Sequence, residues 1–268
     1  NSSPAMQDWR NTLLFVGDDQ DGNTHMQQAN SLADYIRTNY PGFVVKKVLL
    51  DAYKQVSSSS GNRYPDVNKT ILDNFNKGIL IFNYTGHGSE NGIAEEQILL
   101  KQDIEKLNNK GKYPLFITAT CEFSRWDDMI IDEKDGKFKE QSSAGEAALL
   151  NENGGAIALL STTRVVYSHL NHYLNQNFYY KAFLFDDNGQ RYRMGDVIRL
   201  TKNAVGQDRN KLNFTLLGDP ALQLAYPEYQ VVTDSINGIS TKQTLDTLKA
   251  FKEITVSGHI VSHDSLLF

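Results

Sequence analysis

The sequence is poor in cysteine, in net positive charge and in long apolar runs. A single cysteine among 268 residues excludes a disulfide within the chain, and one thiol cannot build a zinc site by itself. It neither requires nor forbids an oxidising compartment. No apolar stretch approaches the length of a membrane span. The opening residues 1–4 also lack the charged and apolar segments of a secretory signal, although we expect the chain to be cut from a longer protein.

Composition and charge narrow the class of protein further. The formal net charge is −5, which gives no reason to propose nucleic acid as a partner. Apolar residues make up 40% and charged residues 22% of the chain, as in ordinary globular proteins. Neither a Walker motif nor a GxGxxG pattern is present. A doubly wound enzyme with a phosphate ligand is therefore the weakest of the functional interpretations.

A glycine-flanked histidine follows the most regular apolar run. Residues 79–82 read ILIF, which is typical of a parallel strand covered on both faces. Gly86 and Gly88 flank His87, so the backbone can turn sharply and approach a ligand closely. Ligands of open α/β sheets bind at the carboxyl ends of strands, where this histidine lies. A lone histidine is more often structural, and a second feature is needed to assign it a function.

The second feature is the cysteine. Residues 115–119 form another apolar run, and Cys121 follows it, 34 positions after His87. A loop and a helix at 101–108 separate the two, and a strand–helix–strand unit of this length places successive strand ends side by side. Imidazole and thiol would then face each other, as a cysteine nucleophile requires. The alternative is a buried, inert cysteine near an unrelated histidine.

This pair predicts acyl transfer through a thioester. Cys121 attacks the scissile carbonyl and His87 manages the protons. The backbone N–H groups of Gly88 and Cys121 hold the developing oxyanion, since a glycine leaves its amide unobstructed.

The remaining pattern predicts an α/β fold with a mostly parallel sheet and helices on both faces. Further strands are expected at 12–17, 43–49 and 156–160, with a short one after the turn at 218–220. Helices are expected at 25–39, 67–76, 142–151, 167–185 and 194–206. Polar side chains gather at the carboxyl ends of four strands: Asp18 and Asp19, His87, Cys121, and Ser161.

The chain changes character after Pro227. Residues 1–227 are predicted to form one α/β domain. Brief β-type segments without a matching helix occupy 228–268, which we expect to be the incomplete start of a β-sandwich (Ig-like) domain.

The motifs resemble one family. Residues 83–90 read NYTGHGSE, and together with the Ala-Thr-Cys at 119–121 they resemble the gingipain family of cysteine peptidases. The resemblance covers about residues 9–226 and implies the caspase-like three-layer fold. The stretch 120–127, the opening 8–11 and the loop 17–26 are most similar to the family's sortase branch, which serves the type IX secretion system.

The resemblance also implies roles for individual residues. His87 and Cys121 would be the catalytic dyad, and Asp19, with Asp18 as its neighbour, would be an acidic helper that orients the imidazole and favours its charged form. The substrate-binding residues implied are Glu122, Ser161, Thr162 and Tyr167. The acid that gives arginine-specific gingipains their specificity has no clear counterpart near 22–24, so arginine specificity is not transferred.

Metal sites find little support in the sequence. Oxygen ligands alternate in 19–23 (DQDGN), so a structural Ca²⁺ is an alternative role for these aspartates, as is capping the helix that follows, but the rest of a calcium loop is missing. His169 and His172 lie three apart with no third ligand to complete a site.

The sequence thus predicts a cysteine endopeptidase or transpeptidase. By resemblance, it would cleave C-terminal secretion-signal domains from exported proteins and transfer the cleaved proteins to a surface glycolipid. It would act on the extracellular face of the outer membrane of a Gram-negative bacterium, with other secretion-system outer-membrane proteins as partners. A catalytically weak docking module for secreted substrates is the competing interpretation.

Overall fold

A computed structural model of the chain describes residues 7–59, 61–132, 134, 136–227, 229–244 and 247–262. The chain divides into two compact units, Asn1–Ala225 and Tyr226–Phe268. The sequence places the same change two residues later, after Pro227. Among the described residues, no helix is both long and apolar enough to cross a membrane.

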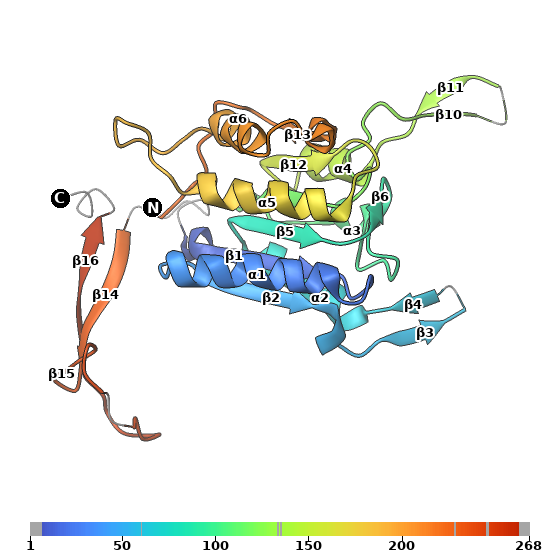
Figure 1. Cartoon of the computed structure of the whole chain (residues 1–268). Coiled ribbons are helices and arrows are strands. Elements are labelled where there is room, and N and C mark those ends of the chain that lie inside the picture. Colours follow the sequence, from blue (N-terminus) through green and yellow to red (C-terminus); the bar gives the residue numbers. More distant parts are fainter. Residues whose placement is uncertain are drawn as a thin grey trace. The chain divides into compact units, whose positions relative to one another are not determined.

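The first unit is built on a six-stranded sheet with the order β13-β12-β9-β5-β1-β2 (Figure 1). Its strands are β1 (Thr12–Gly17), β2 (Val44–Leu49), β5 (Ile81–Thr85), β9 (Leu115–Ala119), β12 (Ala158–Thr162) and β13 (Phe214–Leu217). All neighbours pair in parallel except β12 and β13, which are antiparallel. The mostly parallel sheet predicted from the sequence is confirmed.

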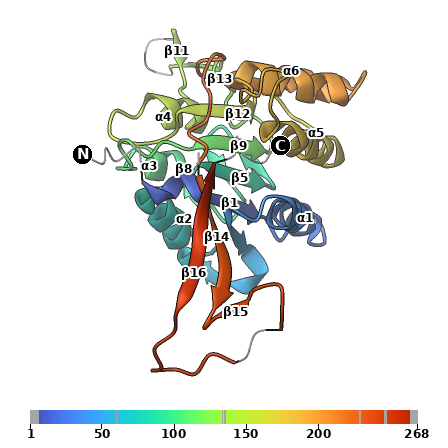
Figure 2. The same cartoon turned by 90° about the vertical axis from the view of Figure 1, so that its left-hand side faces the viewer.

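Helices cover both faces of this sheet (Figure 2). One face carries α1 (Thr24–Asn39), α5 (Ser168–Ala182) and α6 (Met194–Ala204). The other carries α2 (Pro65–Lys77), α3 (Lys101–Ile104) and α4 (Ala144–Leu150). Because both faces are covered, β1, β5, β9 and β12 are buried along their whole length, which explains their continuous apolar runs.

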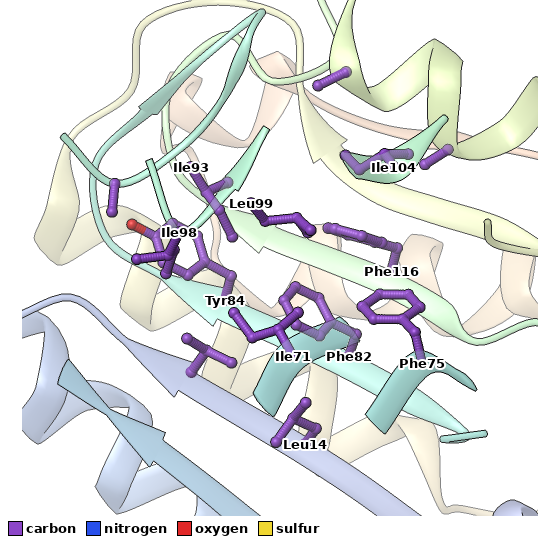
Figure 3. Close-up of a cluster of buried hydrophobic side chains, with 14 of the residues drawn as sticks. Leu14, Ile71, Phe75, Phe82, Tyr84, Ile93, Ile98, Leu99, Ile104 and Phe116 are labelled. Atoms are coloured by element: carbon purple, nitrogen blue, oxygen red, sulfur yellow. The ribbon is translucent and has the colours of Figure 1, made fainter. Parts of the chain in front are cut away.

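The core beneath α2 is a cluster of aromatic and branched side chains (Figure 3). Phe75 of α2 packs against both Phe82 and Phe116, whose ring centroids lie 4.5 Å apart on adjacent strands. Phe116 also stacks on Phe123, two residues beyond the cysteine. This packing anchors the strand that ends at Cys121 and the loop that follows it.

Several short elements lie in the connections. After His87, a small sheet is formed by β6 (Gly88–Ser89), β7 (Gly92–Ile93) and β8 (Leu99–Leu100). Two ribbons are formed by β3 (Val56–Ser58) with β4 (Gly61–Arg63) and by β10 (Met129–Ile131) with β11 (Phe138–Glu140). The 3₁₀ helices are η2 (Asp8–Asn11), η3 (Leu50–Ala52) and η4 (Arg209–Asn213). The 123–141 segment has no clear periodicity because its ribbon is exposed on both faces.

Two local predictions are corrected by the structure. The last strand of the sheet, β13, precedes the turn at Gly218 rather than following it, and the residues after Pro220 form no strand as far as Pro227. The helix expected at 101–108 is a single turn, α3. The serine-capped helix is confirmed, because Ser143 accepts a hydrogen bond from the N–H of Glu146 and forms a capping box with it.

The second unit contains one antiparallel sheet of the order β15-β14-β16. Its strands are β14 (Tyr229–Ile236), β15 (Ile239–Ser240) and β16 (Val256–Ser262). A second sheet, which a sandwich requires, is not seen among residues 229–244 and 247–262, so the Ig-like architecture is not confirmed. Residues 263–268 lie outside the described part of the chain.

Candidate active site

His87 and Cys121 follow neighbouring parallel strands. In the register of β5 with β9, Thr85 lies opposite Ala119, and each reactive residue comes two positions later. Backbone hydrogen bonds join the ends of these strands: the N–H of Gly86 donates to Ala119 O at 3.4 Å. The sheet therefore brings imidazole and thiol to the same edge.

The backbone of His87 is fixed on both sides. Its N–H donates to Asp18 Oδ2 at 3.0 Å, and its carbonyl accepts from Tyr84 Oη at 2.7 Å and from the N–H of Ala94 at 2.9 Å. Asp18 is fully buried. Burial, followed by the nearby Asp18 carboxylate, raises the pKa of Tyr84 well above its usual value, so its hydroxyl stays a donor.

The two glycines beside the histidine are required by close packing. A Cβ on Gly86 would collide with the side chains of Asp18 and Tyr84. A Cβ on Gly88 would lie 2.6 Å from Thr120 Oγ1, on the residue before the cysteine. Gly86 therefore lets Asp18, after β1, come close to the end of β5, and Gly88 does the same for Thr120, after β9.

The carboxylate that meets the His87 ring is Asp21. Its Oδ2 lies 3.1 Å from His87 Nε2, and the His87 side chain is 41% exposed. Asp19, which the resemblance suggested for this role, instead accepts a 2.5 Å hydrogen bond from Tyr64 Oη. Asp18, its neighbour, binds the histidine's backbone rather than its ring.

A second histidine joins the same carboxylate, and sequence analysis did not single it out. His25 Nε2 lies 3.2 Å from Asp21 Oδ2, and the rings of His25 and His87 meet edge to face at 5.2 Å. The four-residue spacing from Asp21 to His25 across a helix start was the available signal. It is weak, because a single Asp–His pair of this spacing is common on helix surfaces.

Cys121 is held more loosely. Its side chain is half-buried and free of any disulfide, and the thiol donates to Val166 O at 3.7 Å. In the part of the chain that the structure describes, the thiol and the His87 ring do not hydrogen-bond to each other. Such bonds are often long or misaligned in the absence of substrate.

The turn after the cysteine is tightly specified. Glu122 adopts a left-handed conformation with φ 50°, and its carboxylate pairs with Arg125 at 3.2 Å. The N–H of Ser124 donates to Thr162 O at 2.9 Å, which ties this turn to β12. A non-glycine residue held in this conformation directly after the candidate nucleophile is typical of functional turns.

The remaining predicted residues differ in accessibility. Ser161 and Thr162 are fully buried inside β12, and their hydroxyls bind Thr118 Oγ1 at 2.7 Å and Thr120 O at 2.5 Å. The role of Ser161 and Thr162 in substrate binding stays a prediction. Their complete burial does not favour that role. Tyr167 is 69% exposed and follows Val166, the partner of the thiol, and its role in substrate binding also stays a prediction. The oxyanion donors Gly88 and Cys121 also stay predictions.

A charged pair joins two loops near the cysteine. Arg164 forms two hydrogen bonds with Asp127, at 2.9 and 2.6 Å. The hydrogen bond from Arg164 is the main reason that the pKa of Asp127 lies below its usual value. This pair joins the loop after Cys121 to the loop after β12. Arg164 precedes Val166, whose carbonyl accepts from the thiol, by two residues.

The family profile of peptidase family C25 matches residues 1–225, which is the whole first unit. The chain belongs to peptidase family C25. No curated protein matches it.

Solved structures of family C25 show the same fold. The arginine-specific cysteine proteinase gingipain R (RgpB) is 20% identical, with 84% of this chain and 50% of that chain covered and a TM-score of 0.59. The complex of the Porphyromonas gingivalis RgpB pro- and mature domains gives 18% identity, 84% and 52% coverage and a TM-score of 0.59. The C25 chain thus spans about half the length of these solved relatives, and its caspase-like fold is confirmed.

More distant structures extend the likeness of fold. Separase, in its complex with securin from Saccharomyces cerevisiae, is 15% identical, with 78% of this chain and 12% of that chain covered and a TM-score of 0.52. Dimeric latent PorU from Porphyromonas gingivalis, at 15% identity with 95% of this chain and 34% of that chain covered, gives a TM-score of only 0.26.

Proposed function

We propose that this C25 chain carries the catalytic centre of a cysteine peptidase, with Cys121 as nucleophile and His87 as general base. The observation that carries the proposal is the register of β5 with β9, which sets both residues two positions beyond paired strand ends. Membership of family C25 supports the same chemistry.

The contacts of the ring determine how it would act. Because His87 Nε2 faces Asp21, its Nδ1 is the nitrogen left to accept the proton of the Cys121 thiol. The thiolate attacks the scissile carbonyl, and the N–H groups of Gly88 and Cys121 stabilise the oxyanion. The imidazolium, balanced by Asp21, protonates the leaving amine and leaves a thioester. Water or an amine then accepts the acyl group.

The proposed substrates are exported proteins with C-terminal secretion-signal domains. Support comes from the sequence alone, where residues 120–127 and the loop 17–26 are most similar to the sortases of the type IX secretion system. In this role the acyl group would pass to an amine on a surface glycolipid. The site of action would be the outer face of a Gram-negative outer membrane, beside other secretion-system proteins.

Turnover of a peptide that spans a secretion-signal junction tests this function. The wild-type chain is expected to cleave it, and Cys121→Ala is expected to bind it without cleavage. Because Cys121 is the only cysteine, iodoacetamide labelling reports on this residue alone. Cleavage by protein whose Cys121 remains unmodified by excess reagent would show that the nucleophile is another group.

A docking module is the second candidate function. One observation favours it: within the described residues, the His87 ring and the Cys121 thiol hydrogen-bond to other partners and not to each other. Equal binding and equal lack of cleavage by the wild-type chain and Cys121→Ala would identify the docking module.

We also propose a structural Ca²⁺ site. It shares only Asp19 with the loop 19–23. Carboxylate oxygens of Asp18, Asp19 and Glu96 lie within 4.8 Å of one another. Asp19 Oδ1 and Glu96 Oε2 are buried and lack a hydrogen-bond partner in the described structure. Hard oxygen ligands of this kind suit Ca²⁺. Added Ca²⁺ should raise the Tm of the wild-type chain and leave that of Glu96→Gln unchanged; equal shifts would exclude this site.

A further inference from the structure

Three ligand atoms converge beside the candidate general base. Asp21 Oδ2 lies 3.2 Å from His25 Nε2 and 3.1 Å from His87 Nε2. All three atoms lie within 4.8 Å of one another. In the proposed mechanism Asp21 serves the His87 ring, and His25 has no part.

The geometry of the cluster suits a tetrahedral metal ion. Zn²⁺ binds imidazole nitrogens and carboxylate oxygens at about 2.0–2.2 Å, so its ligand atoms lie roughly 3.3–3.6 Å apart in a tetrahedral site. The two carboxylate–imidazole separations, 3.1 and 3.2 Å, are close to that spacing. Two imidazoles and one carboxylate also favour Zn²⁺ over Ca²⁺, which prefers oxygen ligands throughout.

His25 is positioned as a metal ligand would be. Its side chain is only 4% exposed, and it lies in the first turn of α1, in contact with Asp21. Its other ring nitrogen, Nδ1, lies 3.4 Å from Ser168 Oγ on α5. When a metal occupies Nε2, the ring proton moves to Nδ1 and donates to this hydroxyl, an outer contact that orients metal-bound histidines.

The backbone directs Asp21 toward the two rings. Asp21, Gly22 and Asn23 adopt successive left-handed conformations, with φ of 55°, 61° and 65°. This turn reverses the chain between β1 and α1. The side chain of Asp21 is 56% exposed and that of His87 41%, so an ion can enter from solvent and keep a water molecule as fourth ligand.

We propose that Asp21, His25 and His87 form a Zn²⁺ site that reversibly switches off the general base. A neutral imidazole bound to metal through Nε2 carries its single ring proton on Nδ1. His87 in that state cannot accept the thiol proton through Nδ1, and no net proton is released when the neutral ring changes tautomer. Binding of the metal does not depend on the proposed function, whereas the switch rests on it.

Metal binding is tested first in the Cys121→Ala chain, which removes the thiol. Calorimetry with Zn²⁺ is expected to show one ion per chain, and Co²⁺ is expected to give the visible absorption of a tetrahedral centre. Both Asp21→Asn and His25→Gln should weaken binding by more than the roughly 10–100-fold that loss of an outer-shell contact costs. Ser168→Ala should fall within that range. Circular dichroism checks that each variant is folded.

The second unit provides a matched control. His259 Nδ1 pairs with Asp234 Oδ2 at 2.7 Å. Among the described residues, this exposed pair belongs to no group of three possible metal ligands. His259→Gln should leave Zn²⁺ affinity unchanged. Unchanged affinity in His25→Gln, or a loss of affinity in His259→Gln, would overturn the proposed site.

Inhibition is tested separately on the wild-type chain. Zn²⁺ should slow peptide cleavage, and a chelator should restore it. Each variant is compared with its own metal-free rate, and His25→Gln should need at least ten times more Zn²⁺ for half inhibition. Equal sensitivity would show that Zn²⁺ acts on the thiol, and the switch would be rejected. Zn²⁺ binding without any cleavage would keep the metal site and reject the peptidase.

Discussion

His87 and Cys121 follow neighbouring strands of one sheet, yet the structure holds them in different ways. The histidine is bound through its N–H, its carbonyl and its ring, by Asp18, Tyr84 and Asp21. The cysteine side chain has one weak donor contact, to Val166 O at 3.7 Å. The base is therefore preorganised, whereas the thiol can change partner by rotation about its side-chain bond.

This difference indicates which of the two residues moves in the proposed reaction. Removing the thiol from Val166 O breaks a weak S–H···O contact, which costs little. Moving the ring would break its contact with Asp21 and disturb a loop that also contacts His25. We therefore expect substrate binding to bring Cys121 toward His87, rather than the reverse, and the predictions below test the two sides separately.

The largest effect is expected on the cysteine side. Cys121→Ala should lower kcat/KM by on the order of 10⁴-fold or more, because no other thiol can form the thioester. The Tm should change little, since the half-buried thiol makes one weak contact. Cleavage kinetics and thermal melting measure the two quantities. Residual cleavage at a similar rate would assign the activity to a contaminant or to another nucleophile.

The next largest effect is expected on the histidine side. His87→Ala should lower kcat/KM by about 10²–10⁴-fold, the usual contribution of general acid–base catalysis. It should also slow alkylation of Cys121 by iodoacetamide at neutral pH, because less thiolate forms. Mass spectrometry of the single cysteine provides the rate. His169→Ala, which removes an exposed histidine from α5, is the matched control and should change neither quantity.

A smaller effect separates the two carboxylates. Asp21→Asn should lower kcat by roughly 10–100-fold, the range typical of residues that orient a functional group. Asp19→Asn should leave kcat unchanged, because Asp19 contacts Tyr64 instead. If Asp19→Asn alone lowers kcat, Asp19 is the helper and the loop rearranges in solution.

The smallest effect is expected at Glu96, a buried acid. Burial raises the pKa of Glu96 above its usual value, so the folded chain holds this proton more tightly than the unfolded chain. In the absence of metal, stability should therefore fall as pH rises from 4.5 through the raised pKa. Glu96→Gln should remove this dependence and raise Tm by about 2–4 °C at neutral pH. Melting curves across that pH range, without Ca²⁺, measure both effects.

Much of the site's framework follows from local sequence. The apolar runs of β5 and β9 predict two buried strands, and the length between His87 and Cys121 predicts one crossover. Right-handed crossovers then leave the strand ends adjacent. Gly86 and Gly88 likewise indicate close packing, which the structure attributes to Asp18, Tyr84 and Thr120.

Other features depend on contacts between distant residues. Ser161 and Thr162 follow the apolar run 156–160, but the strand they belong to continues through them, and their hydroxyls bind Thr118 and Thr120 O. No pattern within 156–163 contains those partners. The exposed β10–β11 ribbon and the placement of β13 before its turn are likewise set by pairing, which local propensity predicts poorly.

The sequence alone was enough to predict that a histidine and the only cysteine follow neighbouring parallel strands. Burial of a strand on both faces requires a continuous apolar run, which can be recognised in the sequence. Only the tertiary structure decided which carboxylate meets that histidine. The sequence indicated Asp19, with Asp18 as its neighbour, whereas the left-handed turn at residues 21–23 places Asp21 at the ring. The same turn brings His25 to that carboxylate, because α1 packs against β1.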